Sequence, residues 1–403
     1  MYKRVEYQTI KNRLVEGRKF IQVVMGPRQV GKSTVVRQVL QDIDIPYQFY
    51  SADNVPATNT AWVSNCWEAT RSLMSVKGYD SIILVIDEIQ KIHNWSEVIK
   101  KEWDDDTFHA RNIKVLLLGS SRVLLERGLS ESLGGRFEEI RMTHWSFPEM
   151  RDCFGFSLNE YIFYGGYPGA AELIHDADRW EQYIQSAIID ATINKDILMD
   201  AAINKPALLR QTFELGAAYS GELLSLTKML GALQDAGNTV TLAGYINLLN
   251  ESGLLCGLQK YSIDTARRRG SIPKFQVYNN SLKMVYIPHT FEQAVIDRKG
   301  WGRIYESCIG SYLVCQAFVH RFEVFYWRDK SDEVDFILRK KGVVIAIEVK
   351  SNAEKSTKGL ETFRKMFNPH STILVGDGGI GAEDFLSMNI KSLFDWYYTS
   401  GME

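Results

Sequence analysis

The sequence predicts an α/β protein that has a parallel β-sheet in its N-terminal part and a second, smaller α/β unit at its C-terminal end. Two observations support this fold class. In residues 1–145, short apolar runs alternate with helix-like segments, which is typical of βαβ units whose sheet is covered on both faces. From about Gly302 onward, one long helix pattern precedes two strand patterns, a further helix and a final apolar run.

The composition is typical of a soluble globular protein. It has 403 residues, of which 45% are hydrophobic and 24% charged, and this length favours two or three domains over one core. The formal charge of −2 offers no global positive field, so any nucleic-acid contact must come from local patches. Five scattered cysteines without a C-x-x-C pair argue against disulfides and zinc. Neither a leader-like N-terminus nor an 18-residue apolar stretch is present, so we expect a cytoplasmic protein without a membrane partner.

The elements follow in order along the chain. Four apolar runs predict fully buried strands of the parallel sheet: Phe20–Met25, Tyr47–Tyr50, Ile82–Ile86 and Val115–Leu118. A helical stretch from Ser146 to about Asp200 is interrupted at Gly165–Gly169, and short helices followed by strand-like runs occupy Pro206–Tyr286. Asp104-Asp105-Asp106 is expected to be a solvated acidic turn. We place domain boundaries at 1–145, 146–204, 205–288 and 289–403.

A phosphate-binding motif follows the first strand. It consists of Gly26, Pro27, Arg28, Gln29, Val30, Gly31, Lys32 and Ser33, and Thr34 continues as a helix. Glycines let the backbone amides wrap phosphates, and the helix N-terminus adds partial positive charge. Lys32 is expected to reach the β and γ phosphates of ATP, and the Ser33 hydroxyl to ligate Mg²⁺. The alternative is a plain Gly-Lys turn before a helix, but the preceding strand and following helix favour a nucleotide site.

Two carboxylates, Asp87 and Glu88, end the strand pattern that begins at Ser81. An acidic strand end is common by itself, but roughly 55 residues after a P-loop it is the expected partner. Asp87 would hold Mg²⁺ through water, and Glu88 would act as the base for the attacking water.

Two further polar residues are candidates for the same site. Ser120 follows the next strand, where it can sense the γ-phosphate or position the attacking water; it can also cap the next helix, and the two roles do not exclude each other. Arg136 follows Leu133-Gly134-Gly135 and is either an arginine finger for a neighbouring subunit or a solvated surface residue.

These motifs, in their order along the chain, resemble those of bacterial and archaeal AAA+-superfamily ATPases that carry a C-terminal restriction-endonuclease-like domain. The motifs are G-P-R-Q-V-G-K-S, I-D-E-I-Q, L-L-G-S-S, L-G-G-R and G-G-Y-P-G. The resemblance implies an ATPase domain over 1–145, a helical lid over 146–204, a winged helix over 205–288 and a nuclease-like domain over 289–403. It also implies Asp87 and Glu88 as metal and catalytic carboxylates, Ser120 as sensor, Arg136 as finger, and a homo-oligomer, usually a hexamer. The role of the Gly165–Pro168 turn does not follow from its chemistry.

The region from Gly221 to Tyr278 fits a winged helix. A helix pattern at Leu242–Glu251 precedes a hairpin of Leu254–Leu258 and Phe275–Tyr278. The hairpin carries Arg267, Arg268 and Arg269 in its loop, with Lys274 close behind, and we expect these four to contact DNA phosphates. A solvated loop or a protein-docking module remains the alternative.

The C-terminal strand patterns carry a third cluster. If Lys341-Gly342 form a two-residue turn, Lys340 faces Val343 and Asp335 lies opposite Glu348, with Lys350 on the same face as Glu348. Together with Glu306 upstream, this matches the restriction-endonuclease-like D…E-x-K pattern and suits Mg²⁺ or Mn²⁺. A hairpin with salt-bridging charges, or a nuclease fold without activity, is the alternative. The helix after Lys350 lacks the glutamine that many relatives place there.

The leading prediction is therefore an ATP-hydrolysing DNA-processing motor, with branched DNA as a substrate by analogy alone. A second hypothesis is an ATP-switched signalling or defence regulator whose nuclease-like domain is inactive and serves for docking. A third is a metal-dependent nuclease regulated by ATP.

Overall fold

The computed structural model describes residues 2–120, 128–129, 132–198, 203–233, 237–264, 270–351 and 358–399. The chain divides into two compact units, Met1–Met142 and Thr143–Glu403. No helix within these described ranges is long and apolar enough to cross a membrane.

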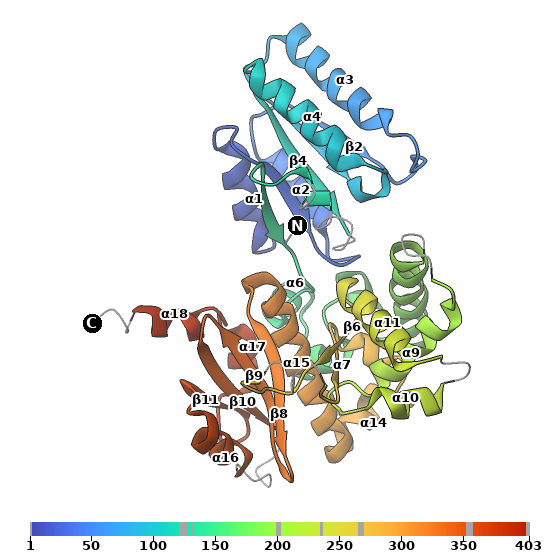
Figure 1. The fold of residues 1–403 in the computed structure, drawn as a ribbon, viewed down its shortest axis with the longest axis vertical. Helices are drawn as coiled ribbons and strands as arrows, with labels where there is room; N and C mark the ends of the chain where they lie inside the picture. The colour runs from blue at the N-terminus through green and yellow to red at the C-terminus, as the bar shows by residue number, and fades with distance from the viewer. Residues whose placement is uncertain are drawn as a thin grey trace. The chain divides into compact units, whose positions relative to one another are not determined.

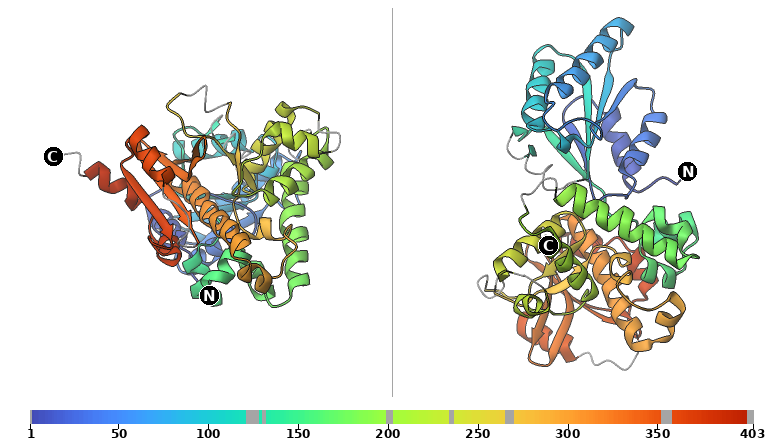
Figure 2. Two further views of the ribbon diagram at one scale, coloured as in Figure 1. Left: turned by 90° about the horizontal axis from the view of Figure 1, so that it is seen from below. Right: turned by 90° about the vertical axis from the view of Figure 1, so that its right-hand side faces the viewer.

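The first unit is a five-stranded parallel sheet in the order β2-β3-β4-β1-β5. Its helices lie on both faces of the sheet, with α3 and α4 packed together on one side and α1 and α2 on the other (Figures 1 and 2). The elements are α1 (Glu6–Val15), β1 (Ile21–Met25), α2 (Lys32–Gln41), β2 (Tyr47–Ser51), α3 (Ala61–Lys77), β3 (Ile82–Asp87), η1 (Ile89–Lys91), α4 (Trp95–Phe108), β4 (Ile113–Gly119) and β5 (Phe137–Arg141). The predicted α/β class with a parallel N-terminal sheet is confirmed.

Some strands of this sheet are predicted well from the sequence and others are not. The three central strands β1, β3 and β4 are buried along their whole length, as their apolar runs predict. Strand β2 is not fully buried as expected, because it is an edge strand with a single neighbour. Strand β5 was not predicted, since Phe-Glu-Glu-Ile-Arg lacks an apolar run. Its Ile140 nevertheless joins the core beside Val24 and Leu116.

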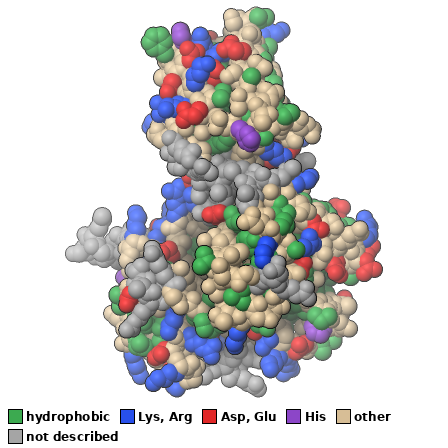
Figure 3. Space-filling view, turned by 45° about the vertical axis from the view of Figure 1, so that its right-hand side comes forward, with side chains coloured by type: hydrophobic (Ala, Val, Ile, Leu, Met, Phe, Trp, Pro, Cys, Tyr) green, Lys and Arg blue, Asp and Glu red, His purple; other side chains and the backbone are tan. Residues whose placement is uncertain are grey.

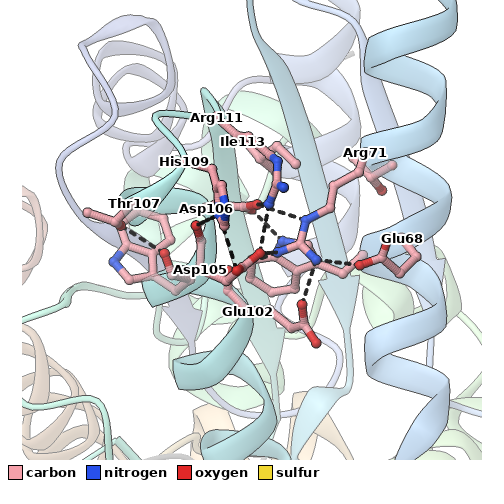
Figure 4. Close-up of polar contacts among 12 residues, drawn as sticks. Glu68, Arg71, Glu102, Asp105, Asp106, Thr107, His109, Arg111 and Ile113 are labelled. Atoms are coloured by element: carbon pink, nitrogen blue, oxygen red, sulfur yellow. Dashed lines mark hydrogen bonds and ion pairs between the residues drawn. The ribbon is translucent and has the colours of Figure 1, made fainter.

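The acidic triplet is not a solvated turn, which corrects the expectation from sequence. It lies in the last turns of α4, where Asp106 is fully buried. Asp106 accepts hydrogen bonds from the Trp67 indole (2.6 Å) and from Arg71 Nε (2.7 Å), as Figure 4 shows for the arginine. Arg71 also pairs with Glu102 (2.8 Å). This network fastens α3 to α4 because the buried charges satisfy one another.

The second unit begins with helices, and its C-terminal part contains a four-stranded sheet with further helices. The helical elements are α6 (Phe147–Phe154), α7 (Leu158–Tyr164), η2 (Pro168–Leu173), α8 (Ala177–Gln182), the π-helical η3 (Tyr183–Asp190) and η4 (Ile193–Ile197), α9 (Pro206–Ala218), α10 (Leu226–Ala232), α11 (Thr239–Glu251), α13 (Ser281–Met284), α14 (Phe291–Ile296), α15 (Arg298–His320), α16 (Lys358–Phe367), α17 (Ala382–Ser387) and α18 (Ser392–Thr399). The strands are β6 (Leu255–Leu258), β7 (Lys274–Val277), β8 (Glu323–Asp329), β9 (Asp332–Lys340), β10 (Val343–Lys350) and β11 (Ser371–Gly376).

The four-stranded sheet has the order β11-β10-β9-β8, with β10 and β11 parallel and the other pairs antiparallel. Lys340 pairs with Val343, which confirms the predicted register. The intervening Lys341 and Gly342 both have positive φ, as a tight two-residue hairpin turn requires. Strands β6 and β7 form a separate antiparallel hairpin after α11.

The Gly165–Pro168 turn has a packing role that its sequence did not reveal. Gly165 has a φ of +71°, and a Cβ atom there would lie 1.9 Å from Asn279 Oδ1. A Cβ atom on Gly166 would lie 2.1 Å from the Trp145 carbonyl oxygen. The same two neighbours hold the turn, because Gly166 N donates to Asn279 Oδ1 (3.2 Å) and Trp145 N donates to Gly166 O (3.2 Å). Only glycines allow this close backbone approach.

Candidate functional site

The P-loop is shaped by the end of β1 and the start of α2. Gly31 precedes the helix with a φ of 89°, and Gln29 also has a positive φ (59°), so the backbone reverses sharply between Gly26 and Lys32. A Cβ atom on Gly26 would lie 2.2 Å from the Met142 carbonyl oxygen, so this position requires glycine. Such a loop turns successive N–H groups toward a phosphate at the helix N-terminus.

The other predicted nucleotide contacts lie on the same loop and helix. Lys32 is buried, and its Nζ donates to the carbonyl oxygens of Gly26 (2.9 Å) and Pro27 (2.8 Å). Lys32 can exchange these carbonyls for phosphate oxygens without leaving the loop. Arg28 is half-buried and Thr34 is exposed on the first turn of α2. Val30 is buried and its carbonyl accepts from Arg4 (3.0 Å), which fixes the loop from below.

The candidate magnesium ligands touch each other. Ser33 Oγ donates to Asp87 Oδ2 at 2.6 Å, although the two residues come from α2 and the end of β3. Burial raises the pKa of Asp87, and the hydrogen bond from Ser33 opposes that shift. A hydroxyl and a carboxylate oxygen are ligands that Mg²⁺ accepts, so these residues fit the ion that accompanies a nucleotide in P-loop sites.

Glu88 is held by two side chains. Ser120 Oγ donates to Glu88 Oε2 (2.9 Å), and Gln90 Nε2 donates to the same oxygen (2.7 Å). Strand β4 lies between β1 and β3, so Ser120 at its carboxyl end lies between the P-loop and the acidic pair. Gln90 was not singled out from the sequence. Its only signal was its place in I-D-E-I-Q, two residues after Glu88.

Arg136 lies at the amino-terminal end of the parallel strands, whereas the P-loop lies at their carboxyl-terminal end. Its carbonyl accepts from Ile21 N (2.8 Å), the first residue of β1, whereas the P-loop follows the last residue of that strand. The five residues of β1 separate these two ends of the sheet by roughly 17 Å. The guanidinium of Arg136 pairs with Asp104 through Nε (2.8 Å) and Nη2 (3.0 Å). Arg136 is therefore not beside the P-loop of its own chain.

The C-terminal carboxylates converge around a lysine. Asp335 is on β9, Glu306 is on α15 and Lys274 begins β7. Lys274 Nζ lies 2.6 Å from Glu306 Oε1 and 3.6 Å from Asp335 Oδ1. It also donates to the Asp335 carbonyl (3.2 Å). Burial alone would lower the pKa of Lys274, but these carboxylates outweigh it and raise the pKa.

Glu348 and Lys350 complete this cluster. Glu348 lies on β10 next to the pair that joins Ile347 to Phe336, and Asp335 Oδ2 accepts from the Val349 backbone amide (2.8 Å). Burial raises the pKa of Glu348, and the charges of Asp335 and Glu306 raise it further. Glu348 Oε2 is buried without a hydrogen bond among the residues that the structure describes. Lys350 is also buried, two positions along the strand.

A polar cavity of about 420 Å³ opens beside the cluster. Its lining comes from three separate chain segments: the loop Gly221–Leu223, helix α15 and the strands β8 to β10. Five carboxylates and two arginines face it: Glu222, Glu306, Glu333, Asp335, Glu348, Arg303 and Arg328.

This cluster does not fit the divalent cation that the sequence pattern implies. The ammonium group of Lys274 already lies between Glu306 and Asp335, where a shared cation would have to bind. Within the described residues, no group of three or more His, Cys, Asp and Glu is spaced to hold a metal ion. We therefore assign no chemical step to a metal at Asp335 and Glu348.

The predicted DNA contacts divide into two groups. Arg267, Arg268 and Arg269 lie outside the described residues. Lys274 is described, and its assignment to DNA is wrong. Its side chain is fully buried and bonded to Glu306, so it cannot reach a phosphate at the surface.

Comparisons with known proteins identify the N-terminal region. Residues 18–151 match the family model described as an AAA domain, so this part of the chain is an AAA-type ATPase domain. Residues 155–289 and 301–383 match two models described as domains of unknown function.

Relatives extend over most of the chain. An uncharacterized protein of Haemophilus influenzae is 21% identical over 394 residues, covering 94% of each chain. An uncharacterized protein of Methanocaldococcus jannaschii is 21% identical over 365 residues, covering 85% of this chain and 78% of the relative. Two variants of Thermotoga maritima RuvB match 63% of this chain and 86% of their own, with 13% and 14% identity and TM-scores of 0.34 and 0.33.

Proposed function

We propose that the chain is an ATP-hydrolysing, AAA-type DNA-processing protein that works as a homo-oligomer, with a hexamer as the expected form. The arrangement around Glu88 carries this proposal. A carboxylate oriented by Ser120 and Gln90 lies beside the Ser33–Asp87 pair at a P-loop, which is the set of groups that hydrolysis of a triphosphate requires.

Different residues of the site bind the phosphates, hold the metal ion and accept the proton. The backbone amides of Gly26 to Ser33 and the Lys32 ammonium bind and orient the phosphates. Ser33 and Asp87 would hold Mg²⁺, which neutralises phosphate charge when bound. Glu88 accepts a proton from the attacking water, and its two hydrogen bonds keep the carboxylate in one orientation.

Arg136 supplies the reason to expect an oligomer. It lies at the end of the strands that is remote from its own P-loop. It would therefore stabilise transition-state charge only at the P-loop of a neighbouring subunit. Within its own chain the guanidinium pairs with Asp104, a contact that it would exchange for the phosphates of the neighbour. Mixing Lys32→Ala chains with Arg136→Ala chains tests this: restored ATPase activity supports shared sites, and two inactive parents that stay inactive on mixing count against them.

DNA contact is assigned to a local patch. Acidic and basic side chains are interspersed on the face in Figure 3, in keeping with the formal charge of −2. The strongest basic run is Arg267 to Arg269, between β6 and β7. Phosphate contacts there would make binding fall steeply with salt. Branched DNA remains an analogy from the family resemblance.

The experiment is an ATPase assay with single-stranded, duplex, forked and four-way DNA, on wild type and on a variant with alanine at Arg267, Arg268 and Arg269. We expect DNA to stimulate turnover in the wild type and the triple variant to lose both stimulation and salt dependence. Equal turnover with and without every DNA form would refute a DNA-processing role while leaving the ATPase assignment intact.

A second candidate function is an ATP-switched regulator whose nuclease-like domain serves for docking. The observation that favours it is the lysine inside the C-terminal carboxylate cluster, which stands in the way of metal-dependent cleavage. It predicts slow turnover, monomeric behaviour and no stimulation by DNA. Sedimentation of the ATP-bound chain beside the assay above separates the two functions.

A further inference from the structure

The C-terminal carboxylate cluster contains its own cation. We propose that Lys274 is a built-in counter-cation that takes the place of a divalent metal ion among Glu306, Asp335 and Glu348. Its ammonium group contacts Glu306 Oε1 at 2.6 Å and Asp335 Oδ1 at 3.6 Å, from a side chain that is fully buried. The cluster is thus a metal-free ionic clamp, and this conclusion is independent of ATP hydrolysis in the first unit.

The backbone fixes Lys274 in this position. Strand β7 begins at Lys274, which pairs with Leu258 on β6 and bridges to Leu223. The next residue, Phe275, donates its amide to the Glu222 carbonyl (3.0 Å) and accepts from Gly221 N (2.8 Å). Backbone hydrogen bonds therefore hold the main chain around the lysine against the neighbouring segments. They direct its side chain into the cluster.

Two further contacts hold the ammonium in place. Its Nζ lies 4.7 Å from the centre of the Phe336 ring and donates to the Asp335 carbonyl (3.2 Å). A lysine withdrawn from these partners would leave an unpaired charge in the core, which is strongly unfavourable. The same oxygens cannot serve the ammonium and a divalent ion together, because the two cations repel at contact distance and compete for the same lone pairs.

The ionic clamp of Lys274 with Glu306 and Asp335 joins two segments of the chain that match different family models. Lys274 belongs to the segment that matches one domain of unknown function, residues 155–289, and the carboxylates belong to the segment that matches the other, residues 301–383. Two ion pairs of one buried lysine thus connect the β6–β7 hairpin with helix α15 and strand β9. The adjoining cavity, with Arg303 and Arg328 at its lining, accordingly lacks the divalent cation that metal-dependent phosphodiester cleavage requires.

The test measures Mn²⁺ binding to the full chain without nucleotide, by electron paramagnetic resonance and by the shift of the thermal unfolding midpoint. The variants are Asp335→Asn, Lys274→Met and the double variant. We expect identical Mn²⁺ titrations for the wild type and Asp335→Asn. The carboxylates are not spaced to hold a metal ion while they surround the lysine, so the proposal requires them to close on Mn²⁺ once the ammonium is removed. Lys274→Met should then gain one Mn²⁺ per chain and, at 100-fold excess over Kd, a midpoint rise of roughly 5 °C, both lost in the double variant.

Two results would overturn the proposal. One is a wild-type Mn²⁺ site that disappears in Asp335→Asn, since the lysine would then not exclude the metal. The other is a folded Lys274→Met variant that gains no Mn²⁺ site, since the carboxylates would then need no cation. If Lys274→Met does not fold, the comparison of wild type with Asp335→Asn still decides, because only a metal-binding cluster makes those two titrations differ.

Discussion

Replacing Ser120 by alanine removes one of the two hydrogen bonds that orient Glu88. Ser120 Oγ lies 2.9 Å from Glu88 Oε2, and the remaining bond from Gln90 is 2.7 Å long. A hydrogen bond to a charged group contributes about 1.5–3 kcal/mol, so we expect kcat for ATP hydrolysis to fall roughly 10- to 150-fold. ATP affinity should stay near the wild-type value, because Ser120 is not part of the P-loop.

The assay is steady-state hydrolysis together with equilibrium binding of a fluorescent ATP analogue. Ser120→Thr is the matched control, since it keeps the hydroxyl and should retain most of the activity. Gln90→Ala removes the other bond, and the double variant should lose less than the product of the single losses because both act through one carboxylate. Wild-type kcat in Ser120→Ala, or a loss confined to ATP affinity, would refute the assigned positioning role.

Three further outcomes concern stability and are read from thermal or denaturant unfolding. Gly165→Ala should destabilise the second unit by about 3 kcal/mol or more, because its positive φ and the 1.9 Å approach to Asn279 exclude a Cβ atom, whereas Gly244→Ala on α11, with open space around it, should cost nothing. Asp106→Ala should destabilise the first unit by roughly 3 kcal/mol, and Asp105→Ala, at a partly exposed carboxylate, by far less. Lys283 donates to the Ser220 carbonyl (2.7 Å), and burial lowers its pKa to about 8. The unfolded chain, with an ordinary pKa of 10.5, therefore binds more protons between pH 8 and 10.5, and stability should rise with pH there by roughly 3 kcal/mol relative to Lys283→Met. A small effect in the first or second variant, or parallel pH profiles in the third pair, would count against the corresponding packing or burial argument.

The sequence predicted those features that depend on neighbours in the chain. Continuous apolar runs marked the central strands of the first sheet, and the spacing of Gly26, Gly31 and Lys32 marked the phosphate-binding turn. The register of β9 and β10 followed from a two-residue turn and strict alternation. In each case the determining interactions lie within a few residues, so local pattern and turn chemistry suffice.

Features that depend on distant partners were not predictable in this way. The sequence pattern places Lys274 at the surface behind an arginine run, but its partners Glu306 and Asp335 lie 32 and 61 residues further along the chain. The pattern likewise predicts a solvated acidic triplet, because its partner Arg71 lies on another helix. Whether a charged side chain is buried depends on tertiary partners that no local pattern encodes.

The central claim, that Glu88 is the base of an ATP-hydrolysing P-loop site, is tested most directly by single-turnover hydrolysis in the Glu88→Gln variant. The amide keeps the shape of the side chain but cannot accept the proton from water. We predict ATP affinity equal to that of the wild type and hydrolysis slower by on the order of 100-fold or more. Hydrolysis at the wild-type rate by a folded, ATP-bound Glu88→Gln chain would contradict the account.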